Sequence, residues 1–267
     1  MKDHIRELVD PSLPRMTNEF RIREYLQEYS LYILHHTKIY RDILFCGGTA
    51  LRFLFKLKRF SEDLDFSAAR EIDFEDILKI LKREFEAAGY DMSVKYKTHS
   101  NVNSAFIKFP GLLNEAGLSG HAPERLSLKF EIDTRPPAGG TAETTPLSRT
   151  FMFHVQHFDL SSLFAGKLHA AFTRAYTKGR DWYDLLWYLT AFPDLTPNLE
   201  MLNNALLQTD PEHAHVTADT WKPWLLAKSK TTDLAKAAED VLRFLEIPSE
   251  ADLISQETFQ KLLTEKE

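Results

Sequence analysis

The chain has 267 residues, of which 43% are hydrophobic and 12% aromatic, a length typical of one or two domains and sufficient to bury an ordinary core. Its formal net charge of −6 argues against a protein that coats nucleic acid through bulk positive charge, although a local basic groove remains compatible with it. The single cysteine cannot form an internal disulfide, the first residues contain no apolar signal core, and no uncharged apolar run approaches the ~20 residues that span a bilayer, so we expect a cytoplasmic protein that does not enter a membrane.

The first third of the chain is predicted to alternate helices and strands. Apolar residues recur at helical spacing from Thr17, a candidate N-cap, to about Thr37. The apolar run from Ile43 to Cys46 breaks on Gly47-Gly48 before a second helical pattern, which predicts a strand, a tight turn and a helix. Asp63 and Asp65 then alternate with apolar residues, so on a strand both carboxylates point to the same side. A further helix is expected after the capping residue Asp73.

The middle third has the alternating pattern of strands. Four strands are predicted, at Met92–Tyr96, Ser104–Phe109, Leu126–Asp133 and Phe151–Val155. The third of these places Lys129, Glu131 and Asp133 on one face. The stretch Thr134–Pro146 contains three prolines and two glycines, and we expect it to be a loop.

Beyond Asp159 the pattern is helical. The expected helices are Leu160–Ala175, Arg180–Ala191, Leu199–Leu207, Thr232–Leu245 and a short one near Glu257–Leu263. The fold class is therefore predicted to be α+β: an antiparallel or mixed sheet flanked by helices over residues 1–157, then a helical domain over 158–267.

Acidic residues on two separate strands suggest a metal site. Asp63 and Asp65 alone are compatible with the solvated face of an ordinary strand. A third acid, Glu131 or Asp133, stands on another strand, and three converging carboxylates give the hard oxygen ligands that Mg²⁺ prefers. Two such ions about 4 Å apart can hold the attacking and leaving oxygens of a phosphoryl or nucleotidyl displacement.

Two further features are suited to phosphate. Gly47-Gly48-Thr49 opens a helix, where unpaired backbone amides favour an anion and missing side chains permit close approach, although a Gly-Gly pair alone is also an ordinary turn. Lys167 and Arg174 share a helical face, as a triphosphate clamp or a solvated stripe would. Asp181 and Asp184 lie among aromatic residues, where an acid is expected to pair with Lys167 or Arg180.

The motifs together resemble a known family. Gly-Gly, a helix and Asp-x-Asp are similar to the signature of polymerase β-type nucleotidyltransferases, and Phe-x-Gly-Gly-Thr-Ala-Leu followed by Arg59, Ser61 and Asp63-Leu-Asp65-Phe resembles the AbiEii/AbiGii-type toxins of bacterial toxin–antitoxin pairs. Three downstream motifs also match, around Glu131, Lys167 and Asp184. The fourteen residues between Gly48 and Asp63 are slightly more than usual for the superfamily, so the role of the loop around Arg59 stays open.

The resemblance implies a Mg²⁺-dependent nucleotidyltransferase toxin that extends the 3′ end of tRNA with a nucleotide from an NTP and is restrained by a cognate antitoxin. Asp63 and Asp65 would bind the metal, with Glu131 as a further ligand or as the base for the incoming hydroxyl. Lys167 would neutralise phosphate charge and Asp184 would orient it or another basic group. The expected nucleotide contacts are Gly47, Gly48, Thr49, Arg59, Ser61 and Lys167. The alternatives are nucleotidylation of a small molecule or a protein, and a binding module that has lost turnover.

Overall fold

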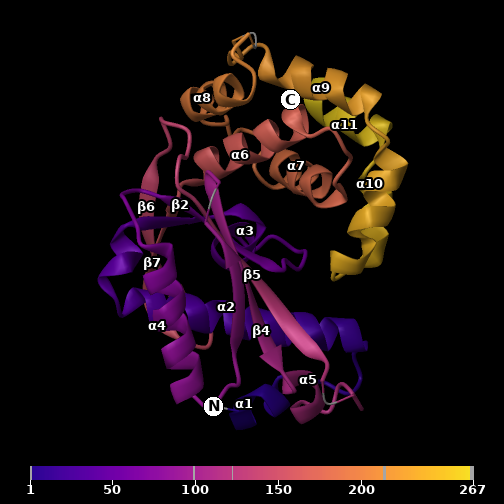
Figure 1. Cartoon of the computed structure of the whole chain (residues 1–267). Coiled ribbons are helices and arrows are strands. Elements are labelled where there is room, and N and C mark those ends of the chain that lie inside the picture. Colours follow the sequence, from indigo (N-terminus) through magenta and orange to yellow (C-terminus); the bar gives the residue numbers. More distant parts are fainter. Residues whose placement is uncertain (1, 99, 122, 213–214, 265–267) are drawn as a thin grey trace. The chain divides into compact units, whose positions relative to one another are not determined.

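The computed structural model describes residues 2–98, 100–121, 123–212 and 215–264, and its chain divides into two compact units (Figure 1). Unit 1 comprises Met1–Ala50, Ser61–Arg135 and Glu143–His157. Unit 2 comprises Leu51–Phe60, Pro136–Ala142 and Phe158–Glu267. Two short segments that precede Phe158 in the sequence therefore belong to the same unit as the C-terminal helices. Within the described ranges, no helix is both long enough and apolar enough to cross a bilayer.

Unit 1 is built on a seven-stranded sheet with the order β3-β4-β5-β2-β1-β7-β6. Strand β2 pairs antiparallel with β1 and parallel with β5, and β1 is parallel to β7. The sheet is therefore mixed, and the predicted α+β class is confirmed. The strands are β1 (Ile43–Cys46), β2 (Asp63–Ala68), β3 (Ser93–Lys97), β4 (Val102–Pro110), β5 (Arg125–Asp133), β6 (Ala142–Ser148) and β7 (Met152–Phe158).

Side-chain alternation explains the central strands. Along β5, Leu128, Phe130 and Ile132 are buried in the core, while the residues between them face the other side. The prediction of a loop over Thr134–Pro146 is wrong in part, because β6 begins at Ala142 and includes Pro146. Strand β6 lies at the edge of the sheet, where the missing N–H of a proline need not have a partner in the ladder.

The helices of unit 1 are α1 (Lys2–Glu7), α2 (Arg15–His35), the 3₁₀ turn η1 (Lys38–Arg41), α4 (Phe74–Ala87) and α5 (Leu112–Glu115), while α3 (Gly47–Phe55) begins in unit 1 and ends in unit 2. Helix α2 is largely buried. Helix α2 starts after Pro14 and not at the predicted cap Thr17. Its buried Glu28 accepts hydrogen bonds from the backbone N–H groups of Thr150 (2.7 Å) and Phe151 (2.8 Å). These bonds offset the cost of burying a carboxylate and join α2 to the segment between β6 and β7.

Unit 2 is mainly helical. It contains α6 (Leu160–Thr173), α7 (Gly179–Ala191), α8 (Leu199–Thr209), α9 (Trp221–Thr231), α10 (Leu234–Val241), α11 (Gln256–Thr264) and the 3₁₀ turns η2 (Leu242–Phe244) and η3 (Pro248–Leu253). Helix α6 packs against α7, and Phe164 stacks on the buried ring of Tyr188 with 4.3 Å between ring centroids. Helix α9 was not predicted, and the predicted helix over Thr232–Leu245 is shorter because it continues as η2.

Candidate active site

The acidic residues of β2 and β5 share one face of the sheet. Asp63 and Asp65 alternate along β2, and the parallel register aligns Asp65 with Glu131 and Asp63 with Lys129. All four side chains are half-buried, whereas the residues between them are buried in the core on the opposite face. The other candidate, Asp133, aligns with Ser67, which lies two residues after Asp65 on β2. The register therefore places Glu131 beside Asp65. We call Asp63, Asp65, Lys129 and Glu131 the acidic face.

Lys129 shows that the acidic face attracts a cation. Its Nζ lies 2.7 Å from Oε2 of Glu131. Burial alone would lower the pKa of Lys129, but the carboxylate of Glu131, with those of Asp63 and Asp65, outweighs burial and raises this pKa above its ordinary value. In the described part of the chain no three acidic, histidine or cysteine side chains are already arranged to hold a metal ion. The oxygen donors have the chemistry that Mg²⁺ requires. The negative charge that stabilises the ammonium of Lys129 would also stabilise such an ion.

The first turn of α3 brings its backbone against one of these carboxylates. Gly47 has a φ of +73°, in the left-handed region that favours glycine. A Cβ added at this position would overlap Oδ2 of Asp65 and lie 2.9 Å from its Cβ and Cγ. Gly47 is therefore needed for two reasons: its backbone conformation and the close approach of Asp65.

Replacing Gly47 with alanine is expected to destabilise unit 1 and displace Asp65. The strained backbone should cost about 1–3 kcal/mol, and the clash with the carboxylate adds to that cost. Thermal unfolding measures the loss. Gly117→Ala is the matched control, because Gly117 also has a positive φ (+75°) but no atom within 4 Å of an added Cβ. Equal losses in the two variants would contradict a specific contact between Gly47 and Asp65.

Buried polar side chains fix the start of β2. Thr49, which is fully buried, donates its hydroxyl to the backbone carbonyl of Asp63 at 2.5 Å. Gln27 of α2, also fully buried, donates Nε2 to the carbonyls of Ser61 (3.1 Å) and Asp63 (3.4 Å). The side chains of Thr49 and Ser61 and the backbone of Gly48 are buried. Gln27 is not among the predicted site residues, although a polar residue within the apolar pattern of α2 was the available signal.

Unit 2 holds a second charged cluster, around Asp184. This residue of α7 is fully buried, and its two carboxylate oxygens accept from Nε (2.5 Å) and Nη2 (2.6 Å) of Arg59. Lys167 of α6 places Nζ 2.7 Å from Oδ2 of Asp184. Burial alone would raise the pKa of Asp184, but the charges of Arg59 and Lys167 outweigh burial and hold this pKa below its ordinary value. Asp184 is thus an ionised acid shared by two cations.

Arg59 is engaged inside unit 2. Its side chain is 2% exposed, and Nη1 donates to the carbonyl of Phe60 at 2.9 Å. The neighbouring basic residues Lys56 and Lys58 are exposed. In this structure the guanidinium of Arg59 therefore positions Asp184.

Asp181 extends the cluster by one turn of α7. It lies 3.4 Å from Nζ of Lys167 and also pairs with the guanidinium of Arg174. The helix predicted to reach Ala175 and to carry Arg174 on one face is shorter, because α6 ends at Thr173 and Arg174 has an extended backbone. The charges of Lys167 and Arg174 nevertheless meet at Asp181.

Unit 1 thus combines a mixed sheet, the acidic face and the glycine turn of α3, the arrangement expected of the nucleotidyltransferase class that the sequence motifs resemble. The fold is similar to the crystal structure of JHP933 from Helicobacter pylori, with a TM-score of 0.56, 20% sequence identity and 90% of each chain covered. It is equally similar to a putative nucleotidyltransferase from H. pylori, with a TM-score of 0.56, 21% identity and 90% of this chain and 93% of that chain covered. The chain belongs to the family described as nucleotidyl transferase AbiEii toxin, Type IV TA system, which matches residues 32–265. No curated protein matches the sequence.

Proposed function

We propose that this protein transfers a nucleoside monophosphate from an NTP to the 3′ hydroxyl of tRNA, and that it acts in the cytoplasm as the toxin of a toxin–antitoxin pair. The hydroxyl oxygen forms a bond to the α-phosphorus, the bond to the leaving oxygen breaks, and pyrophosphate departs. The observation that carries the proposal is the register of Asp65 with Glu131 beside the glycine turn at Gly47. Family membership supports the nucleotidyltransferase class and an antitoxin. The choice of tRNA follows from the resemblance noted above.

The acidic face carries the metal in this proposal. Asp63, Asp65 and Glu131 would hold Mg²⁺, with Glu131 as a ligand or as the base that takes the hydroxyl proton. When bound, the ion offsets negative charge on the phosphates. Gly47 and Gly48 contribute no side chains of their own at the start of α3, where the helix N-terminus would favour a phosphate. Thr49 fixes the backbone of Asp63, and Ser61 lies directly before the strand that presents both aspartates.

The resemblance noted above assigns the basic group to Lys167. Lys167 is proposed to neutralise phosphate charge as pyrophosphate leaves. Asp184 positions Lys167 through its 2.7 Å ion pair, and Arg59 in turn positions Asp184. We therefore assign Arg59 as a positioning residue and not as a direct nucleotide contact.

The test is incubation of the full chain with Mg²⁺, each labelled NTP in turn, and total tRNA. Label on tRNA with at least one NTP, together with released pyrophosphate, is the expected result. Label on a small metabolite or on a polypeptide would replace tRNA by another acceptor. NTP binding by calorimetry without pyrophosphate release would indicate a binding module without turnover. Absence of label with all four NTPs would overturn the proposal.

A further inference from the structure

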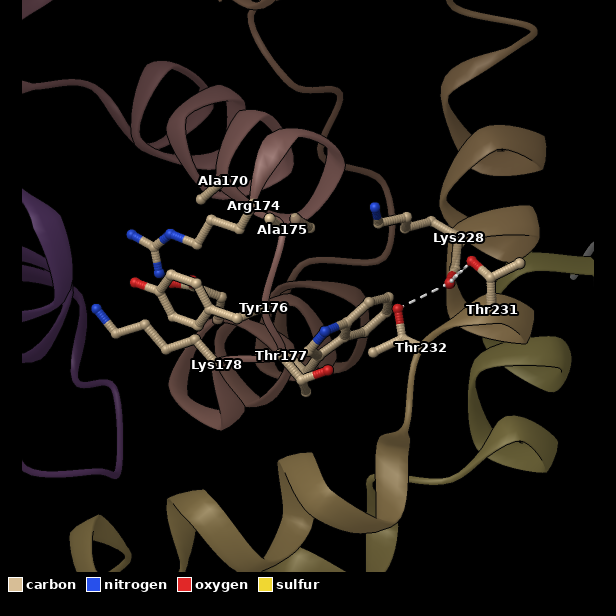
Figure 2. Close-up of a pocket in the computed structure, with 12 residues that line it drawn as sticks. Ala170, Arg174, Ala175, Tyr176, Thr177, Lys178, Lys228, Thr231 and Thr232 are labelled. Carbon is tan, nitrogen blue, oxygen red and sulfur yellow. Dashed lines mark hydrogen bonds and ion pairs between the residues drawn. The ribbon is translucent and has the colours of Figure 1, made fainter.

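A polar pocket lies within unit 2, where the segment between α6 and α7 faces the end of α9. Figure 2 shows Arg174, Tyr176 and Lys178 on one side and Lys228, Thr231 and Thr232 on the other. The pocket encloses about 120 Å³. This is below the roughly 300–1,000 Å³ of sites that bury a whole drug-sized ligand. It has room for a phosphate group.

The charges that line this pocket favour an anion. Three cations, Arg174, Lys178 and Lys228, line it, against one carboxylate, that of Asp181. That carboxylate is already shared by Arg174 and Lys167. The lining is therefore positive in a protein whose net charge is negative.

Lys178 is affected both by its burial and by the neighbouring cations. Burial, followed by the repulsion of Arg180 and Arg174, lowers the pKa of Lys178 to about 8. An anion placed among these cations would reduce the repulsion and favour the charged ammonium.

Two hydrogen bonds fix the backbone of Lys228 near the end of α9. The hydroxyls of Thr231 (3.0 Å) and Thr232 (2.9 Å) both donate to the carbonyl of Lys228. The ammonium of Lys228 donates to the carbonyl of Phe172 at 3.3 Å. An ammonium carries three N–H donors, and this bond uses one of them.

Tyr176 gives the pocket an aromatic rim. Its side chain is 67% exposed although it is a large ring. Positively charged grooves combined with exposed aromatic rings are the means by which proteins bind single-stranded nucleic acid, because the rings stack on bases and the cations contact the backbone. The ring lies in the same segment as Arg174 and Lys178, at one side of the pocket.

We propose that this pocket binds a phosphodiester group of a single-stranded polynucleotide, with a neighbouring base stacked on Tyr176. The small volume accepts a phosphate while the base remains outside against the exposed ring. The identity of that polynucleotide as the RNA acceptor rests on the proposed function, whereas the binding site itself does not.

The test measures binding of the full chain to a short labelled single-stranded RNA by fluorescence anisotropy, at several salt concentrations and without NTP. Lys228→Gln is expected to weaken binding about 5- to 10-fold and to reduce the magnitude of the salt slope by about 0.7, the value for one phosphate contact on a single strand. Lys230→Gln is the matched control, because Lys230 is an exposed lysine of the same helix that does not line the pocket. Tyr176→Ala is expected to weaken binding about fivefold or more and Tyr176→Phe much less, since stacking needs only the ring.

The affinity for NTP, measured in parallel by calorimetry, should not change in these variants. Equal effects of Lys228→Gln and Lys230→Gln on RNA binding would overturn the proposal. So would a loss of NTP affinity as large as the loss of RNA affinity, because it would assign the pocket to the triphosphate. RNA binding that follows these expectations without any nucleotidyl transfer would contradict only the proposed function.

A measurement on the unmodified chain tests the proposed site without any substitution that disturbs folding. The low pKa of Lys178 should make its amine react readily with an acylating reagent near pH 8. Saturating single-stranded RNA is expected to slow this acylation severalfold, as read by peptide mass spectrometry. Identical rates with and without the RNA would contradict the proposed site.

Discussion

Replacing Asp184 with alanine is expected to destabilise unit 2 by about 3–5 kcal/mol, the range measured when one partner of a buried ion pair is removed. The variant leaves the guanidinium of Arg59, whose side chain is 2% exposed, without its carboxylate, and removes the 2.7 Å partner of Lys167. Urea unfolding followed by tryptophan fluorescence measures the loss, with a signal that comes from this unit. All four tryptophans of the chain belong to unit 2: Trp182, Trp187, Trp221 and Trp224.

Two control variants separate the buried pair from a general effect of charge. Asp194→Ala removes an exposed carboxylate of unit 2 and should change the free energy of unfolding by no more than about 0.5 kcal/mol. The double variant Arg59→Leu with Asp184→Leu removes both charges and should lose less than Asp184→Ala, because no unpaired guanidinium remains. A loss below about 1 kcal/mol for Asp184→Ala would show that the pair does not stabilise the unit.

The pH dependence of the same measurement gives a further expectation. The pKa of Asp184 is below its ordinary value in the folded chain, so the unfolded chain binds more protons between the two pKa values and stability rises with pH there. The stabilisation is complete above the unfolded pKa of about 4 and is lost as the pH falls through the folded one. The difference in unfolding free energy between the unmodified chain and Asp184→Asn should therefore shrink below about pH 4. If the difference in unfolding free energy does not change between pH 6 and pH 2, the lowered pKa of Asp184 is contradicted.

Patterns of short range could be predicted from the sequence. The capping role of Asp73 is confirmed by its bond to the N–H of Asp76 at 2.9 Å, and β1 occupies the predicted residues Ile43–Cys46. These features depend on neighbours a few positions away, which the sequence displays directly. The edge strand β6 was missed because its proline is a breaker signal, and only the order of strands in the sheet makes that proline tolerable.

Features that depend on long-range contacts could not be predicted in the same way. Arg59 and Asp184 are 125 positions apart, and no local pattern indicates that the loop arginine enters unit 2. The alignment of Asp65 with Glu131, and not with Asp133, depends on the register of β2 and β5, and a shift of two residues would preserve every side chain on its face. Gln27 was missed for the same reason, since its partners lie on a different segment of unit 1.

Replacing Asp65 with asparagine is expected to lower nucleotidyl transfer by about 10²-fold or more, because metal-ion stabilisation of developing phosphate charge contributes several kcal/mol and each 1.36 kcal/mol is a factor of ten in rate. Asparagine keeps the shape of the side chain beside Gly47 but removes the negative charge. The measurement is initial velocity of label transfer at saturating NTP, together with Mg²⁺-dependent NTP binding by calorimetry, which should weaken in parallel.

Glu71→Gln is the matched control for the loss of one carboxylate, since Glu71 is exposed and follows β2 in the same unit. It should retain near-normal velocity. Asp63→Asn should resemble Asp65→Asn, and the double variant should be little slower than either single one, because residues that act as a unit give non-additive losses. If Asp65→Asn keeps both its folding transition and full velocity, the acidic face is not the catalytic centre. If it loses velocity while Mg²⁺-dependent NTP binding is unchanged, Asp65 acts on the reacting groups without holding the metal.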